Sequence, residues 1–104
     1  MRVQGRVAAI TGGTRGIGRG IAEGFLREGA QVVISGRSEE KGTRAIEEMD
    51  GGDRVHFISG DISIQEDAES FIDGVLNKFG RLDILVNNAG GSHSFAPVAE
   101  LSDD

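Results

Sequence analysis

A glycine-rich segment near the N-terminus has the residue types and spacing that suit phosphate binding. Residues 11–18 read Thr-Gly-Gly-Thr-Arg-Gly-Ile-Gly and lie between an apolar run and an amphipathic segment. Glycines at such a turn let the backbone approach a phosphate without a Cβ in the way, and the N-terminus of the next helix attracts the anion. No Lys-Ser or Lys-Thr pair follows, which excludes a P-loop. The pattern predicts a pyrophosphate-binding turn, and the alternative is a purely structural turn.

The elements that would position this turn are visible as alternating apolar runs and helical patterns. The expected strands cover residues 7–10, 32–34, 55–58 and 82–86, and the expected helices cover 16–28, 39–49 and 65–79. Most of the runs are nearly continuous, which is typical of strands buried on both faces of a parallel sheet. The order β-α-β-α-β-α-β predicts an α/β fold with a Rossmann-like, doubly wound parallel sheet of four strands and three helices.

Residues 1–104 are expected to form a single, partial domain, with residues 91–104 as a loop and tail. The strand at 82–86 is expected to be an unpaired apolar edge. Ser38 is placed to cap the second helix, and Ser63 with Glu66 matches a capping box before the third. Gly80 is a residue type that ends helices in the left-handed conformation.

Two further motifs follow the later strands. Asp61-Ile62 comes after the third run, and Asn87-Asn88-Ala89-Gly90 comes after the fourth. Together with the T-G-x-x-x-G-x-G pattern of residues 11–18, they resemble the short-chain dehydrogenase/reductase family, from about residue 5 to residue 90. The resemblance covers the N-terminal, nucleotide-binding half of that family.

The resemblance implies a dinucleotide site at the carboxyl ends of the strands, where open α/β sheets bind ligands. The residues expected around the phosphates and the adenosine ribose are Gly12, Thr14, Arg15, Gly16, Ile17 and Gly18. Those expected at the adenine are Asp61 and Ile62, and those expected beside the nicotinamide and its ribose are Asn88, Ala89 and Gly90. An alternative for Asn87 and Asn88 is structural, with their amides bridging neighbouring strands.

The end of the second strand bears on the choice of cofactor. Proteins that bind NAD place an acidic residue there to accept from the ribose 2′-hydroxyl, whereas this chain has Gly36 followed by Arg37. A guanidinium suits a 2′-phosphate, and Arg15 could approach from the other side. The sequence therefore favours NADP(H) over NAD(H). The alternative is that Arg37 is an ordinary solvated side chain.

The residues that carry out catalysis in the family are not found in this chain. Family members interconvert a carbonyl and an alcohol by hydride transfer, using a Ser and a Tyr-x-x-x-Lys pair, and the chain has no Tyr. No catalytic residue is assigned, so the chain is expected to be the cofactor-binding half of such an oxidoreductase and inactive by itself. The alternatives are a non-catalytic nucleotide-binding module complete at 104 residues and, less favoured, a methyltransferase.

Composition narrows the possible partners. The net charge of −6 disfavours nucleic-acid binding. There is no Cys, no metal-ligand spacing and no apolar run of membrane-spanning length. His56 is expected to be structural and His93 to be a loop residue. A small carbonyl or alcohol substrate, a cytoplasmic location and a homo-oligomer of the full-length protein are the remaining expectations.

Overall fold

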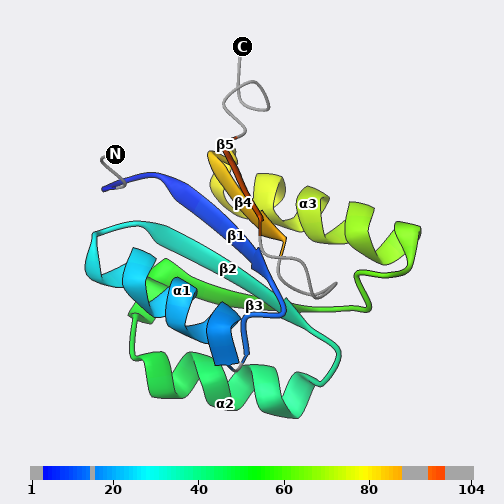
Figure 1. The fold of residues 1–104 in the computed structure, drawn as a ribbon, viewed down its shortest axis with the longest axis horizontal. Coiled ribbons are helices and arrows are strands. Elements are labelled where there is room, and N and C mark those ends of the chain that lie inside the picture. Colours follow the sequence, from blue (N-terminus) through cyan, green and yellow to red (C-terminus); the bar gives the residue numbers. More distant parts are fainter. Residues whose placement is uncertain (1–3, 15, 88–93, 98–104) are drawn as a thin grey trace.

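The structure is a computed structural model that describes residues 4–14, 16–87 and 94–97 (Figure 1). The predicted strands and helices all form, with bounds within one or two residues of those expected. The strands are β1 (Val7–Thr11), β2 (Gln31–Gly36), β3 (Val55–Ser59), β4 (Ile84–Asn87) and β5 (Ser94–Pro97). The helices are α1 (Gly16–Arg27), α2 (Glu39–Met49) and α3 (Gln65–Phe79), with a short 3₁₀ turn at Gly52–Arg54.

One sheet of strand order β3-β2-β1-β4-β5 organises the molecule (Figure 1). The first four strands are parallel, and β1 lies between β2 and β4. Ala9 pairs with Val33 on one side and with Leu85 on the other. The chain therefore builds outward from β1 through β2 to β3, and α3 then carries it back across the sheet to β4.

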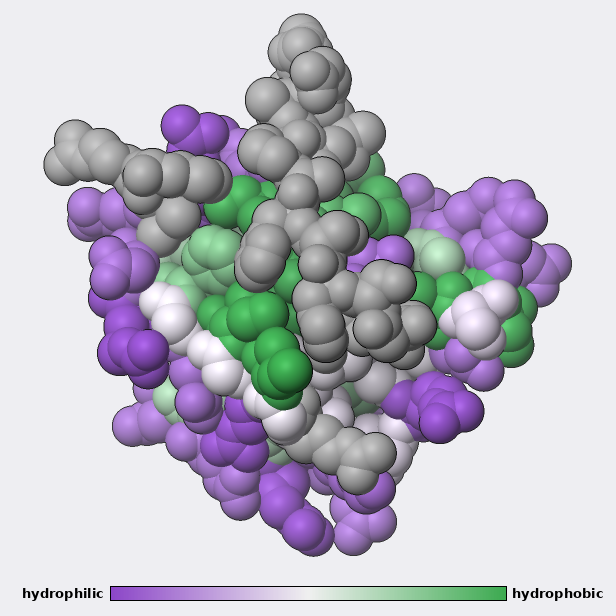
Figure 2. All heavy atoms as spheres, viewed as in Figure 1, coloured by the Kyte–Doolittle hydropathy of each residue, from purple (hydrophilic) through white to green (hydrophobic). Residues whose placement is uncertain are grey.

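Helices cover both faces of the sheet, so each face has its own core. Ala8 and Ile10 pack in the core on the side of α1 and α2, where Leu26 is also buried. Val7 and Ala9 face the other way, into the core that contains Phe71 of α3. Burial on both faces explains why the strands are apolar runs rather than alternating patterns. On the face drawn in Figure 2, hydrophilic residues lie around the rim and hydrophobic residues lie nearer the middle.

The α2 helix lies very close to the sheet because it carries a glycine at the contact. A Cβ added at Gly42 would overlap with the Phe57 ring of β3. The Phe57 ring takes the space that a side chain at position 42 would need. The missing side chain thus sets the separation between α2 and β3.

The helix ends follow the sequence in part. The Ser38 hydroxyl caps α2 by accepting from the Lys41 backbone N–H at 3.2 Å, and Gly80 ends α3 with φ 77°. The capping box predicted for α3 is wrong. The helix begins one residue later than the box requires, so Ile64 is the N-cap and has no side-chain cap bond, while the Ser63 hydroxyl donates to Asp61 Oδ1 at 2.6 Å and the Ser63 N–H donates to the same oxygen. Within the described ranges, no helix is both long and apolar enough to cross a membrane.

The expectation of a loop over 91–104 is wrong for residues 94–97. They form β5, which pairs antiparallel with β4, so β4 is an inner strand and not the unpaired edge that the sequence suggested. The open edge of β4 offers backbone N–H and C=O groups, and pairing satisfies them. Pro97 has no N–H to donate, and it stands at the last residue of this edge strand, where proline is tolerated. Residues 91–93 and 98–104 lie outside the described residues.

Candidate functional site

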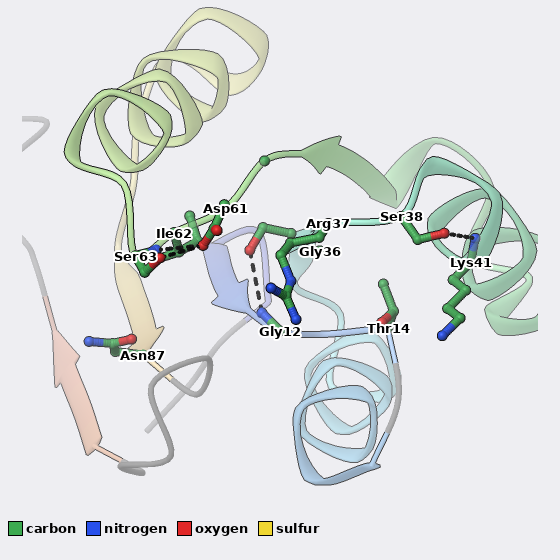
Figure 3. A pocket seen from close by; sticks show the side chains of 12 residues that line it. Gly12, Thr14, Gly36, Arg37, Ser38, Lys41, Asp61, Ile62, Ser63 and Asn87 are labelled. Carbon is green, nitrogen blue, oxygen red and sulfur yellow. Dashed lines mark hydrogen bonds between the residues drawn. The ribbon is translucent and has the colours of Figure 1, made fainter.

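The carboxyl ends of the four parallel strands border a cleft of about 690 Å³ (Figure 3). Its position is the one at which open α/β sheets bind ligands, where the chain leaves β1 toward neighbours on opposite sides. The residues that line it are Gly12, Thr14, Ser35, Gly36, Arg37, Ser38, Lys41, Gly60, Asp61, Ile62, Ser63 and Asn87. Five of the residues predicted from the sequence are among them: Gly12, Thr14, Arg37, Asp61 and Ile62.

The glycine-rich turn is held against the end of β2. The backbone N–H of Gly12 donates to the Ser35 hydroxyl at 3.3 Å, and that of Gly13 donates to the Ser35 carbonyl at 3.1 Å. Gly12 has φ 68°, which favours glycine. A Cβ added at Gly13 would lie 2.6 Å from Ile34 Cγ2, so position 13 needs glycine for packing although the motif leaves it variable. Ser35 therefore holds the glycine-rich turn in place through two hydrogen bonds. The sequence analysis did not identify this residue.

The first turn of α1 follows this loop directly. Gly16 has φ 64°, Ile17 is 60% exposed and Gly18 is buried, and none of the three lines the cleft itself. The first turn of α1 carries no acidic residue, so nothing there opposes an anion at the positive end of the helix dipole. Arg15 lies outside the described residues.

Asp61 and Ile62 lie together on the loop that leaves β3 (Figure 3). The Asp61 carboxylate accepts at Oδ1 from the Ser63 hydroxyl and, at 3.0 Å, from the Ser63 backbone N–H. These two hydrogen bonds hold the pKa of Asp61 below its usual value, and the charge of Arg37 lowers the pKa further. The carboxylate is therefore an ionised hydrogen-bond acceptor at neutral pH.

Two cations stand at the α2 side of the cleft. Arg37 precedes the Ser38 cap, and Lys41 follows it in the first turn of α2 (Figure 3). Asp61 is the one carboxylate residue among the lining residues, so the charged side chains that line the α2 side of the cleft are both cations, in a chain of net charge −6. Sequence reasoning found Arg37 but missed Lys41. Its signal was a basic residue three positions after a predicted N-cap.

Asn87 both joins two strands and lines the cleft. Its Oδ1 accepts from the Thr11 hydroxyl at 3.2 Å, which links the ends of β4 and β1. The structural role expected for this amide is therefore compatible with its place at the cleft. The predicted site residues Asn88, Ala89 and Gly90 lie outside the described residues, so their places relative to the cleft stay predictions.

The histidine that the structure describes is held by contacts within the fold. His56 Nε2 lies 2.8 Å from the Asp53 carbonyl oxygen, and its ring packs edge-on against Phe79 with centroids 5.4 Å apart. These contacts give His56 a structural role. In the part of the chain that the structure describes, no group of three or more His, Asp or Glu side chains is arranged to hold a metal ion. His93 lies outside the described residues.

Comparison with known proteins identifies the family. A family model described as short chain dehydrogenase matches residues 6–104. The chain belongs to the short-chain dehydrogenase/reductase family. Its fold is therefore that of a family of oxidoreductases with a Rossmann-like nucleotide-binding sheet.

Individual members of the short-chain dehydrogenase/reductase family are similar over most of this chain. Dehydrogenase/reductase SDR family member 4 from Caenorhabditis elegans is 42% identical over 104 residues, which is 98% of this chain and 40% of that protein. L-sorbose reductase from Gluconobacter frateurii, solved with NADPH and L-sorbose, has a TM-score of 0.81 at 38% identity and covers 99% of this chain and 40% of that one. A 3-ketoacyl-(acyl-carrier-protein) reductase from Brucella melitensis, complexed with NADH, has a TM-score of 0.74 at 40% identity and covers 80% and 34%. The chain thus spans less than half the length of these relatives.

Proposed function

We propose that this chain binds NADP(H) and supplies the cofactor site of an oxidoreductase that interconverts a carbonyl and an alcohol by hydride transfer. The observation that carries the proposal is the pair of cations at the α2 side of the cleft. Arg37 and Lys41 line the cleft beside Gly36. Gly36 stands at the end of β2, where NAD-binding proteins have a carboxylate. A 2′-phosphate is attracted by both cations, whereas a 2′-hydroxyl gains little from them.

The residues that line the cleft and the turn beside it have chemistry that suits the cofactor. Gly12 has no Cβ to block a pyrophosphate, and α1 begins with a turn free of acidic residues. The Asp61 carboxylate would accept from the adenine amine, and Ile62 would contact the base. Arg37, with Lys41, would hold the 2′-phosphate. When bound, the nicotinamide ring supplies or accepts the hydride.

Catalysis is proposed to depend on groups other than those found here. The family performs proton transfer with a Tyr, and no Tyr occurs among the 104 residues. We therefore propose that the chain binds cofactor without turnover by itself. A small carbonyl or alcohol substrate, homo-oligomeric assembly of the full-length protein and a cytoplasmic location complete the proposal.

The test is a comparison of NADPH and NADH affinity, read by nicotinamide fluorescence. NADPH is expected to bind more tightly, and Arg37→Ala combined with Lys41→Ala is expected to weaken NADPH binding by on the order of tenfold to a hundredfold while leaving NADH nearly unchanged. Arg44→Ala is the matched control, because Arg44 is an exposed cation on the same helix that does not line the cleft. Equal affinity of the wild-type chain for both dinucleotides would contradict the NADP(H) preference.

The second candidate that we propose is a non-catalytic nucleotide-binding module, in which the whole protein would lack the Tyr that is absent from these 104 residues. It shares the binding prediction and differs in chemistry. The protein purified from its natural source would then bind NADPH without oxidising it in the presence of any ketone. Ketone-dependent loss of NADPH absorbance in that preparation would exclude the module and support the oxidoreductase.

A further inference from the structure

Asp67 holds the loop that carries Asp61, although it does not line the cleft. It lies in the first turn of α3, and its Oδ2 accepts from the backbone N–H of Asp61 at 2.8 Å. Gly60 lies against the same side chain, since a Cβ added there would be 3.4 Å from Asp67 Cβ. The Asp67 side chain thus contacts both residues at which the chain turns from β3 into the cleft.

The other hydrogen bonds described for this loop join it to β2 or lie within the loop itself. Gly60 N–H donates to the Gly36 carbonyl at 2.9 Å, which ties the loop to β2. The Ser63 N–H donates to Asp61 Oδ1, and the Ile64 N–H donates to the Asp61 carbonyl at 2.9 Å, so both lie within the loop. Among these bonds, the one from Asp61 to Asp67 is the link from the loop to a side chain of α3. The orientation of Asp61 therefore depends on α3 through Asp67.

A general role for Asp67 at the helix terminus does not account for this contact. Acidic residues in the first turn stabilise a helix through its dipole, and Glu66 offers the same charge one residue earlier. Glu66 is exposed and is not part of the loop contacts described above. Both carboxylates can therefore interact with the helix dipole, but the hydrogen bond from the Asp61 N–H is made to Asp67. Comparing variants of the two residues distinguishes the effect of charge from the effect of this bond.

We propose that Asp67 is a positioning residue for base recognition, which aims the Asp61 carboxylate at the exocyclic amine of adenine. The inference rests on the proposed NADP(H) binding. An amine donates to a carboxylate, whereas hypoxanthine presents a carbonyl oxygen at the same place and is repelled by it. The ratio of the dissociation constants of the hypoxanthine and adenine dinucleotides therefore reports how well Asp61 is aimed.

The experiment titrates the 104-residue chain with NADPH and with its reduced hypoxanthine analogue, and records the melting temperature of each variant. The wild-type chain is expected to prefer the adenine form. Asp67→Ala is expected to lower that preference by roughly threefold to tenfold, on the scale of the net contribution of one ordinary hydrogen bond. Asp67→Asn keeps an acceptor oxygen and is expected to retain the preference. Glu66→Ala, the matched control, loses the same charge and is expected to retain it too.

The outcomes separate this inference from the function on which it rests. If Asp67→Ala does not fold, Asp67→Ser replaces it, because a short polar side chain suits the start of a helix but does not reach the Asp61 N–H. An unchanged preference for adenine in a folded Asp67→Ala or Asp67→Ser protein overturns the positioning role and leaves NADPH binding intact. A wild-type chain that binds neither dinucleotide overturns the proposed function itself.

Discussion

Asp83 is a buried carboxylate at the end of the sheet away from the cleft, and it joins the start of β1 to the start of β4. Its Oδ2 accepts from the Val7 N–H at 2.9 Å, and the Arg81 guanidinium donates to both of its oxygens at 2.8 and 2.7 Å. Burial raises the pKa of Asp83, but the hydrogen bonds from Arg81 and Val7 outweigh it, and the net pKa is lowered.

A lowered pKa makes Asp83 a source of acid sensitivity. A carboxylate with a depressed pKa in the folded state stabilises the fold above its unfolded pKa, near 3.9, and this contribution is lost as the pH falls through the folded pKa. Asp83→Asn is expected to lower the free energy of unfolding by about 1–3 kcal/mol at pH 7 and by less at pH 3. Urea unfolding at the two pH values measures this, with the exposed Asp73→Asn as the control. An equal loss at both pH values would contradict the role of the charge.

At the level of single residues, the sequence predicted the cleft residues that belong to a local sequence pattern. Arg37 was found because it follows a recognisable strand, and Gly12 because glycine spacing is a local pattern. Ser35 and Lys41 were missed because their roles depend on how β2 and α2 meet the turn in space. The capping box failed because its Glu66 carboxylate would have accepted from the Ser63 N–H. In the structure, the Asp61 carboxylate, two residues before Ser63, accepts from this N–H and from the Ser63 hydroxyl.

At the level of elements, two helical glycines make opposite predictions for one substitution. Gly20 in α1 is exposed and has no atom within 4 Å of an added Cβ, so Gly20→Ala is expected to raise the free energy of unfolding by about 1 kcal/mol. Gly42 in α2 is buried against the Phe57 ring, so Gly42→Ala is expected to lower it by about 1–3 kcal/mol. Urea unfolding of both variants is the measurement. A stabilised Gly42→Ala protein would show that α2 can move away from β3 at little cost.

The elements themselves were the part of the fold most accessible to sequence. Long helical stripes such as that of α3 and continuous apolar runs such as that of β1 carry their structure in local pattern. β5 does not, because a strand of four residues is held by pairing with β4 rather than by its own sequence. An outer strand of this kind depends on a neighbour that local pattern does not reveal.

At the level of the whole molecule, stability is expected to fall from the centre of the sheet to its edges. β1 and β2 are covered by helices and by neighbours on both sides, whereas β3 and β5 each have one open edge. Amide hydrogen exchange is therefore expected to be slowest in β1 and β2 and faster in β5, because opening an edge exposes less apolar surface. Protection in β5 equal to that in β1 would indicate that the sheet opens as one unit.

The strand order also sets an order in time. A chain synthesised from its N-terminus acquires β1, β2 and β3 before α3 and β4, and those first three strands are neighbours in the sheet. The residues proposed to hold the phosphates and the adenosine run from Gly12 to Asp61. Asp61 is synthesised roughly 26 residues before Asn87, an interval of about 1–5 seconds at ordinary rates of translation. The proposed cofactor site would thus be assembled in the direction of translation, with the residues proposed for the adenosine made before those proposed for the nicotinamide.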